Sequence, residues 1–110
     1  MKKKNRVRKA EEFQNIIHSG KKYVCHQYVM YAVPKAEDES RIGISLSKKI
    51  GNAVERNKIK RQVRMMCQEL VHFDTCNYDF ILIIRFGYKN CDYATNKNSL
   101  EKLCIKATIL

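Results

Sequence analysis

Apolar and polar positions follow two different periods along the first half of the chain. Residues 9–18 place apolar side chains at helical spacing behind two acidic residues, which predicts a short helix ended by a glycine. Residues 23–33 are rich in valine and tyrosine and predict β structure. After a polar, acidic loop, residues 41–46 alternate, with isoleucine and leucine on one face, and predict a further strand.

The second half of the chain predicts a long helix, a buried strand and a last helix. Residues 54–70 form the long helix, on which one apolar stripe faces the core. The stripe consists of Ile59, Val63, Met66, Cys67 and Leu70. Residues 78–86 are almost continuously apolar, as in a strand buried on both faces, and residues 93–106 predict a helix. The order helix, two or three strands, helix, strand, helix predicts an α+β sandwich with a mainly four-stranded sheet.

Net charge is distributed very unevenly along the sequence. The formal net charge is +11, and residues 1–64 carry all of this excess, with 17 Lys or Arg against 6 Asp or Glu. Residues 65–110 hold five of each. This asymmetry predicts a face that binds a polyanion, within one small domain over residues 1–110 whose residues 1–8 are a basic tail. No apolar run is long enough for a membrane span or a secretory signal. An anionic membrane surface could attract the basic tail, but the second basic cluster lies inside a folded element, so no membrane partner is expected.

The densest positive charge lies on the long helix and on the turn before it. Between residues 48 and 64 there are seven Lys or Arg and one acidic residue, Glu55. At about 100° per residue, one continuous arc beside the apolar stripe carries Arg56, Asn57, Lys60, Arg61 and Arg64. A solvated helix face is the usual explanation of a charge run, but one acid leaves too few partners for ion pairs along the helix. We therefore expect nucleic-acid phosphates to bind here, with an affinity that falls as salt rises.

Cysteine, histidine and carboxylate residues form no clear catalytic or metal-binding motif. The five cysteines are odd in number and include no C-x-x-C pair, which is typical of reduced, packed thiols in a cytosol. Cys67, His72 and Cys76 offer three candidate zinc ligands without the paired close spacing of structural zinc sites, so no metal site is expected. The carboxylates and histidines are scattered over different elements. The chain itself is therefore expected to bind RNA and not to cut it.

Residues 41–61 closely resemble the signature of the bacterial ribonuclease P protein component. Their core, Lys-Lys-Ile-Gly-Asn-Ala-Val-x-Arg-Asn, is far more specific than a generic basic patch. The resemblance extends over nearly the whole chain. Besides the basic start, it includes Phe13 on the first helix, Tyr28 and Tyr31 on a strand, and the apolar strand around Phe80.

The resemblance implies a two-layer α+β sandwich in the order helix-β-β-β-helix-β-helix, with a four-stranded sheet and a left-handed βαβ crossover. The general preference for right-handed crossovers would not predict that hand. It also implies the non-catalytic protein subunit of ribonuclease P, the endoribonuclease that removes 5′ leaders from precursor tRNA in the cytoplasm. The implied partners are the catalytic RNA, which uses Mg²⁺, and precursor tRNA, with no small-molecule substrate and no cofactor bound by the protein itself.

The family's binding residues carry over to this chain with two departures. Its arginine-asparagine-arginine motif becomes Arg56, Asn57 and Lys58, which keeps the charge but loses a bidentate phosphate contact. A second aromatic residue on the first helix becomes Ile17, which stacks on bases less well. The resemblance implies RNA binding by Lys48, Lys49, Asn52, Arg56, Asn57, Lys58, Lys60, Arg61 and Arg64. It implies binding of the single-stranded leader by Phe13, Ile17, Tyr31, Lys60 and Arg64.

Tyr28 and Tyr31 differ by an odd number, so an unbroken strand sends them to opposite faces of the sheet. At most one of them can line a cleft for the leader, and the resemblance points to Tyr31. One alternative stays open at this point, a structural RNA-binding protein of ribosomal type that never contacts a substrate strand. Cleavage that depends on leader length would separate the two functions.

Overall fold

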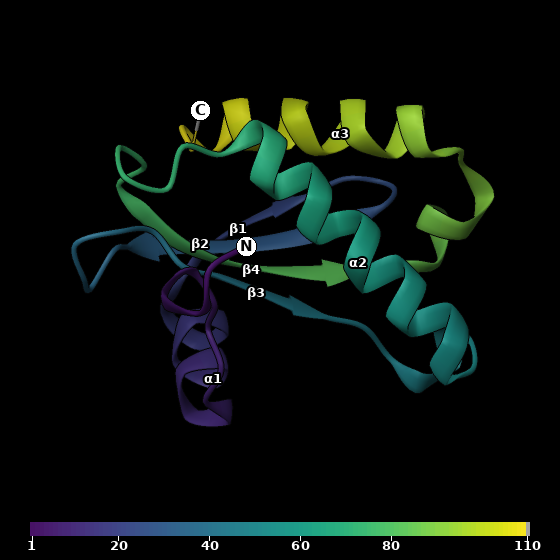
Figure 1. Cartoon of the computed structure of the whole chain (residues 1–110), viewed down its shortest axis with the longest axis horizontal. Helices are drawn as coiled ribbons and strands as arrows, with labels where there is room; N and C mark the ends of the chain where they lie inside the picture. Colours follow the sequence, from purple (N-terminus) through teal and green to yellow (C-terminus); the bar gives the residue numbers. More distant parts are fainter. Residues whose placement is uncertain (110) are drawn as a thin grey trace.

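Within residues 1–109, which the computed structural model describes, three α-helices and four strands form an α+β fold (Figure 1). The helices are α1 (Ala10–Ser19), α2 (Ala53–Leu70) and α3 (Tyr93–Lys106). The strands are β1 (Lys21–Val24), β2 (Tyr28–Pro34), β3 (Ile42–Ser45) and β4 (Tyr78–Ile84). Short 3-10 helices are η1 (Lys3–Asn5), η2 (Lys48–Ile50) and η3 (Phe86–Asn90). The predicted order of elements is confirmed.

The strands form one mixed sheet in the order β1-β2-β4-β3. β1 and β2 are an antiparallel hairpin, and β4 pairs antiparallel with β2. β3 and β4 are parallel neighbours, with Ile42 opposite Phe80, and α2 connects them. This connection is the expected βαβ crossover, and it carries α2 across one face of the sheet.

The main core lies between the sheet and the pair α2 and α3, which cover the same face (Figure 1). Tyr28 and Phe80 are among its fully buried side chains. The predicted stripe of α2 is confirmed, because Ile59, Val63, Met66 and Cys67 are buried and Leu70 is half-buried. Within residues 1–109, no helix combines the length and the apolarity needed to cross a lipid bilayer.

α1 lies on the opposite face of the sheet from α2 and α3 (Figure 1). Ile16 of α1 and Ile81 of β4 are buried there in a second apolar cluster, where Phe13 is partly buried. Gly43 on β3 makes room for the Phe13 ring, since a Cβ at this position would stand 2.6 Å from the ring's Cζ. The sandwich expected from the sequence therefore has an additional, partial layer formed by α1.

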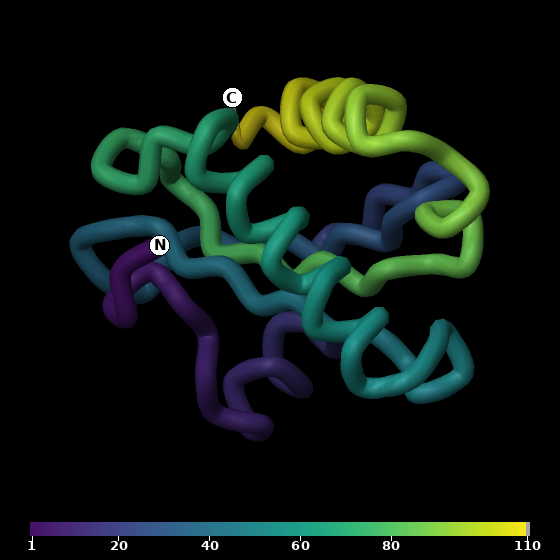
Figure 2. The backbone as a smooth tube through the Cα atoms, turned by 45° about the vertical axis from the view of Figure 1, so that its right-hand side comes forward, coloured from purple at the N-terminus to yellow at the C-terminus, as the bar shows by residue number. Residues whose placement is uncertain are grey.

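The basic N-terminal segment packs against β3 before it enters α1 (Figure 2). Arg6 forms a parallel β-bridge with Ile42, and the N–H of Val7 donates to the Ile42 carbonyl at 2.8 Å. Val7 is buried in the α1 cluster. Asn5 is also buried and donates from Nδ2 to the Ser40 carbonyl at 2.9 Å. Residues described as a tail on composition alone thus extend one edge of the sheet.

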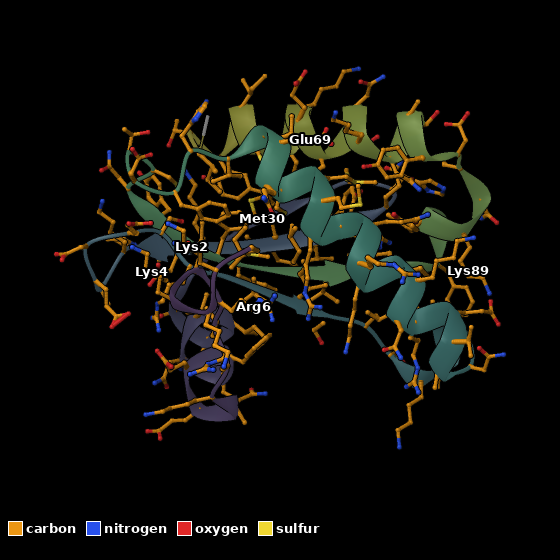
Figure 3. All side chains as sticks on the ribbon, in the orientation of Figure 1. Lys2, Lys4, Arg6, Met30, Glu69 and Lys89 are labelled. Atoms are coloured by element: carbon orange, nitrogen blue, oxygen red, sulfur yellow. The ribbon has the colours of Figure 1, made fainter. Side chains whose placement is uncertain are left out.

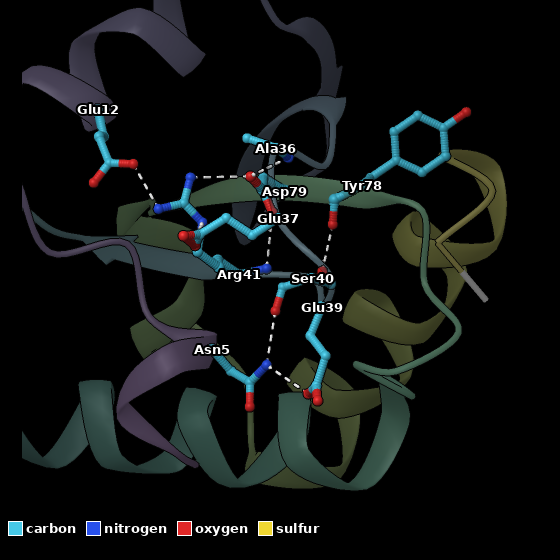
Figure 4. A network of polar contacts seen from close by, with 9 residues as sticks. All are labelled: Asn5, Glu12, Ala36, Glu37, Glu39, Ser40, Arg41, Tyr78 and Asp79. Carbon is cyan, nitrogen blue, oxygen red and sulfur yellow. Dashed lines mark hydrogen bonds and ion pairs between the residues drawn. The ribbon is translucent and has the colours of Figure 1, made fainter.

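Arg41 is the centre of a polar network that ties α1 to the sheet (Figure 4). Its guanidinium donates to Glu12 of α1 at 2.5 Å and to Asp79 of β4 at 3.1 Å, and it lies 3.6 Å from Glu37. Asp79 is 1% exposed and also accepts the backbone N–H groups of Arg41 and Ala36. Burying a carboxylate is costly unless it is paired and hydrogen-bonded, so Arg41 and the two backbone N–H groups offset the cost of burying Asp79 on β4.

Candidate nucleic-acid interface

Two capped turns carry the chain from β3 into α2. Ser47 Oγ accepts the N–H of Lys49 at 3.2 Å at the start of η2. Asn52 Oδ1 accepts the N–H of Glu55 at 2.9 Å, the hydrogen bond of a helix N-cap. These turns leave Lys48 and Lys49 exposed immediately before α2.

Two neighbouring hollows on the surface share Met1, Arg6 and Arg64, and we call them together the basic trough. The first has a volume of about 510 Å³ and runs along α2. Its other lining residues are Asn57, Lys60, Arg61, Met65 and Gln68. The second has a volume of about 280 Å³ and reaches α1 and β3. Its other lining residues are Val7, Arg8, Phe13, Ile42 and Ile44.

The basic trough joins a cationic helix face to an aromatic ring. Figure 3 places Arg6 on the N-terminal segment, between α1 and α2. Arg6 and Arg64 line both hollows, so they mark the point where one passes into the other. A flexible chain with negative charges and flat, apolar groups would match such a surface, because each part of the trough complements one of its features.

The positive charge of α2 is uncompensated in the part of the chain that the structure describes. Among residues 1–109, the seven Lys and Arg between residues 48 and 64 make no ion pair within 4.0 Å. Glu55, the acidic residue among them, instead pairs with Lys89 at 3.0 Å. Arg56 is half-buried, and its Nε is buried without an acceptor. Cations held together in this way repel one another until a polyanion binds.

The structure brings together some of the predicted site residues and separates others. Asn57, Lys60, Arg61 and Arg64 line the basic trough together with Phe13. Phe13 and Arg64 of α2 line the same hollow although about fifty residues separate them in the sequence. This meeting depends on the crossover, which brings α2 back over β3.

Lys58, Ile17 and Tyr31 lie outside the basic trough. Lys58 lines a different pocket, between α2 and α3. Ile17 and Tyr31 are half-buried in the apolar cluster on the α1 face, where Phe13 also packs. Tyr28 is fully buried in the main core. The prediction that the two tyrosines face opposite sides of the sheet is therefore confirmed.

The predicted site residues included neither Arg6 nor any residue of β3, and the sequence did not distinguish Arg8 from ordinary surface charge, although all of these line the basic trough. Arg6 and Arg8 flank the buried Val7, so their side chains are directed away from the apolar cluster. The alternation Arg-Val-Arg is a strand signal, but three residues are too few to distinguish it from a basic tail.

The three candidate zinc ligands, Cys67, His72 and Cys76, lie in different environments. Cys67 and Cys76 are buried among apolar side chains, whereas His72 is exposed after the end of α2. Burial raises the pKa of the Cys67 thiol above its ordinary range, and burial raises the pKa of Cys104 to about 12. Among the residues described, no group of three His, Cys, Asp or Glu is arranged to hold a metal ion.

Asn52 is a predicted RNA-binding residue and also caps α2. Two variants separate these roles. Asn52→Ala should lower the free energy of unfolding by about 1 kcal/mol, because the cap acceptor is lost. Asn52→Asp keeps an acceptor and should stay within about 0.5 kcal/mol of the unmodified chain, while its negative charge weakens RNA binding. Urea denaturation and RNA titration measure the two effects. Equal losses of stability in both variants would contradict the capping role.

Comparison of the sequence with known proteins gives full-length matches. The family model described as Ribonuclease P matches residues 1–108. The ribonuclease P protein component of Halalkalibacterium halodurans is 38% identical over 111 residues, which cover 100% of this chain and 93% of that protein. The corresponding protein of Bacillus cereus is 45% identical over 101 residues, which cover 91% of this chain and 88% of that protein.

Solved structures agree with the sequence comparison. The RNase P protein of Staphylococcus aureus superposes with a TM-score of 0.85 at 35% identity, covering 96% of both chains. The RNase P protein of Thermotoga maritima superposes with a TM-score of 0.77 at 28% identity, covering 89% of this chain and 93% of that one. Sequence and fold together show that this chain belongs to the family of ribonuclease P protein components.

Proposed function

We propose that the basic trough holds the 5′ leader of precursor tRNA, and that the exposed cations at the start of α2 dock on the catalytic RNA. The chain is a protein component of ribonuclease P, the ribonucleoprotein enzyme of tRNA 5′ processing, so an RNA partner is part of its function. What remains to be assigned is which surface takes which RNA.

The observation that carries the proposal is the uncompensated row of cations that ends beside Phe13. Hydrogen-bond donors along α2 come from Asn57, Lys60, Arg61 and Arg64. At the other end of the trough, Phe13 supplies an aromatic ring. A single strand presents a phosphate and a base at every nucleotide, and a positively charged groove with an aromatic platform binds both. A duplex would present phosphates but no free base for the ring.

The remaining predicted residues divide between the two RNAs. Lys48 and Lys49, exposed before α2, are proposed to contact the catalytic RNA, together with Arg56. Ile17 and Tyr31 are proposed to support the Phe13 ring from the apolar cluster in which all three pack. In this scheme the protein supplies position and charge neutralisation in the cytoplasm, where precursor tRNA is processed. Bond cleavage belongs to the RNA subunit and the Mg²⁺ ions that it uses.

The leader assignment predicts a loss of binding that depends on the substrate. Phe13→Ala should weaken binding of precursor tRNA to the reconstituted enzyme by about 5- to 100-fold, because stacking on one base is worth about 1–3 kcal/mol. Tyr31→Ala should cost less, since Tyr31 lines neither hollow of the basic trough. Binding of mature tRNA, which has no leader, should stay within about twofold. Precursors with leaders of increasing length, assayed at low Mg²⁺, provide the measurement.

His18→Ala is the matched control, since His18 is exposed on the same helix as Phe13 and lines neither hollow. Equal weakening of precursor and mature tRNA by Phe13→Ala would move the leader elsewhere. It would also favour the ribosomal-type alternative, an RNA-binding protein without substrate contact, which predicts no dependence on leader length.

A further inference from the structure

A second pocket opens on the side of α2 that faces away from the basic trough. It has a volume of about 260 Å³ and lies where α2, η3 and α3 meet. Among its lining residues are Lys58, Gln62, Tyr93 and Asn96. Ligand pockets are usually somewhat larger, so this one has room for a single flat ring and not for a longer ligand.

Asn96 carries a buried acceptor that nothing in residues 1–109 satisfies. Asn96 is 1% exposed, and its Oδ1 has no hydrogen-bond partner. Its Nδ2 donates to the carbonyls of Tyr88 at 3.0 Å and of Cys91 at 3.4 Å. Turning the amide over would bring Oδ1 against these two carbonyls, so its orientation is fixed. An unpaired buried acceptor costs free energy, and a donor from a ligand would recover it.

Three other side chains complete a site for a nucleotide. Gln62 accepts the hydroxyl of Tyr88 at 2.8 Å with Oε1, which leaves its Nε2 available as a donor. Tyr93 is 37% exposed and offers an aromatic face. Lys58 is exposed and, among the residues described, makes no ion pair. The acceptor and the donor match the edge of a base, the aromatic face of Tyr93 matches its ring, and Lys58 matches the phosphate of one unpaired nucleotide.

We propose that this pocket receives one unpaired nucleotide of ribonuclease P RNA, whose exocyclic amino group donates to Asn96 Oδ1 while its ring lies on Tyr93 and its phosphate on Lys58. Adenine, cytosine and guanine carry such an amino group and uracil does not. The inference rests on the proposed binding of the catalytic RNA by α2. It gives Lys58, which faces away from the basic trough, its own contact with that RNA.

Binding of ribonuclease P RNA by variants of the full chain tests the proposal. Tyr93→Ala should weaken binding about 5- to 100-fold, whereas Tyr93→Phe, which keeps the ring, should stay within about twofold. Phe86→Ala is the control, because it removes an exposed aromatic residue of η3 that does not line the pocket. In the reconstituted enzyme, Tyr93→Ala should leave the dependence of precursor-tRNA binding on leader length unchanged. Loss of binding by Phe86→Ala to the same degree would overturn the proposal.

The failure of this inference and the failure of the proposed function are distinguishable. If Tyr93→Ala binds as well as the unmodified chain while Lys49→Ala does not, the pocket is not a nucleotide site and the start of α2 still docks on the catalytic RNA. If neither variant loses affinity, the proposed docking by α2 fails as well.

A measurement on the unmodified chain removes any dependence on the folding of variants. Nuclear magnetic resonance would follow the side-chain amides of Asn96 and Gln62 during titration with cytidine monophosphate, uridine monophosphate or inorganic phosphate. Saturable shifts of both amides with the cytidine nucleotide, larger than with the uridine nucleotide and absent with phosphate, are expected. Equal shifts with phosphate alone would reveal an anion site without base recognition and would overturn the proposal, as would the absence of any shift.

Discussion

Replacing Arg41 by methionine should lower the free energy of unfolding by about 3 kcal/mol, a large part of the stability of a domain of this size. The reason is that Asp79, which is 1% exposed, would stay buried and lose its guanidinium partner. The two backbone N–H groups that it accepts would remain, so the loss should not exceed about 5 kcal/mol. Urea denaturation, analysed as a two-state transition, gives the value.

A second substitution shows whether the isolated charge is the cause. Adding Asp79→Asn to Arg41→Met removes the buried charge but keeps an acceptor for the backbone donors, so it should restore part of the lost stability. Lys97→Met breaks a more exposed ion pair, with Glu69, and should change stability little. If Arg41→Met costs no more than Lys97→Met, the network of Figure 4 has no special role in holding α1 and β4 together.

Removing three cations from the basic trough should weaken binding of precursor tRNA to the reconstituted enzyme by about 100-fold at moderate salt. The variant combines Lys60→Ala, Arg61→Ala and Arg64→Ala, and the estimate assumes about 1 kcal/mol for each phosphate contact. The slope of the logarithm of affinity against the logarithm of salt concentration should become shallower by about 2–3, because three fewer counterions are released. Filter binding over a range of salt concentrations measures both quantities.

The control changes net charge equally at a different place. Lys97→Ala, Lys102→Ala and Lys106→Ala together remove three cations from α3, which lines no part of the trough. This variant should keep the original salt slope within about 0.5. An equal effect of the two triple variants would mean that RNA responds to the overall charge and not to a defined surface on α2.

Local periodicity was sufficient to predict the helices and most of the strands. α2 has one uninterrupted apolar stripe and an asparagine cap, so the predicted start at residue 54 differs from the observed one by a single residue. α3 has the predicted bounds, Tyr93–Lys106. The hairpin of β1 and β2 was predicted as one β-rich run, because its turn contains neither glycine nor proline.

The contacts between distant segments could not be predicted from the pattern. A single β-bridge joins Arg6 to Ile42, and one bridge has no periodicity to reveal it. Asp79 was one of several scattered carboxylates in the sequence, and only the sheet brings it to Arg41. The hand of the crossover was expected from the family resemblance, against the general rule.

Helical geometry alone places Lys58 apart from Arg56, Lys60 and Arg64 on α2. At about 100° per residue, Lys58 lies almost opposite Lys60 on the helix, whereas Arg56 and Arg64 lie close to Lys60. Counting charges along the sequence therefore places Lys58 in one group with Lys60, although the helix directs the two side chains to different surfaces. The structure resolves the group into a trough on one side and a pocket on the other.

Gly43 allows the Phe13 ring to pack closely against β3, because position 43 has no Cβ. Gly43 has no side chain, and the ring, together with Ile81 Cδ1, occupies the space that an alanine Cβ would fill. A single codon change there would shift the aromatic platform without altering any residue that is proposed to contact RNA. Differences in substrate preference between natural relatives or engineered forms can therefore originate at a position that a survey of cations and aromatics would pass over.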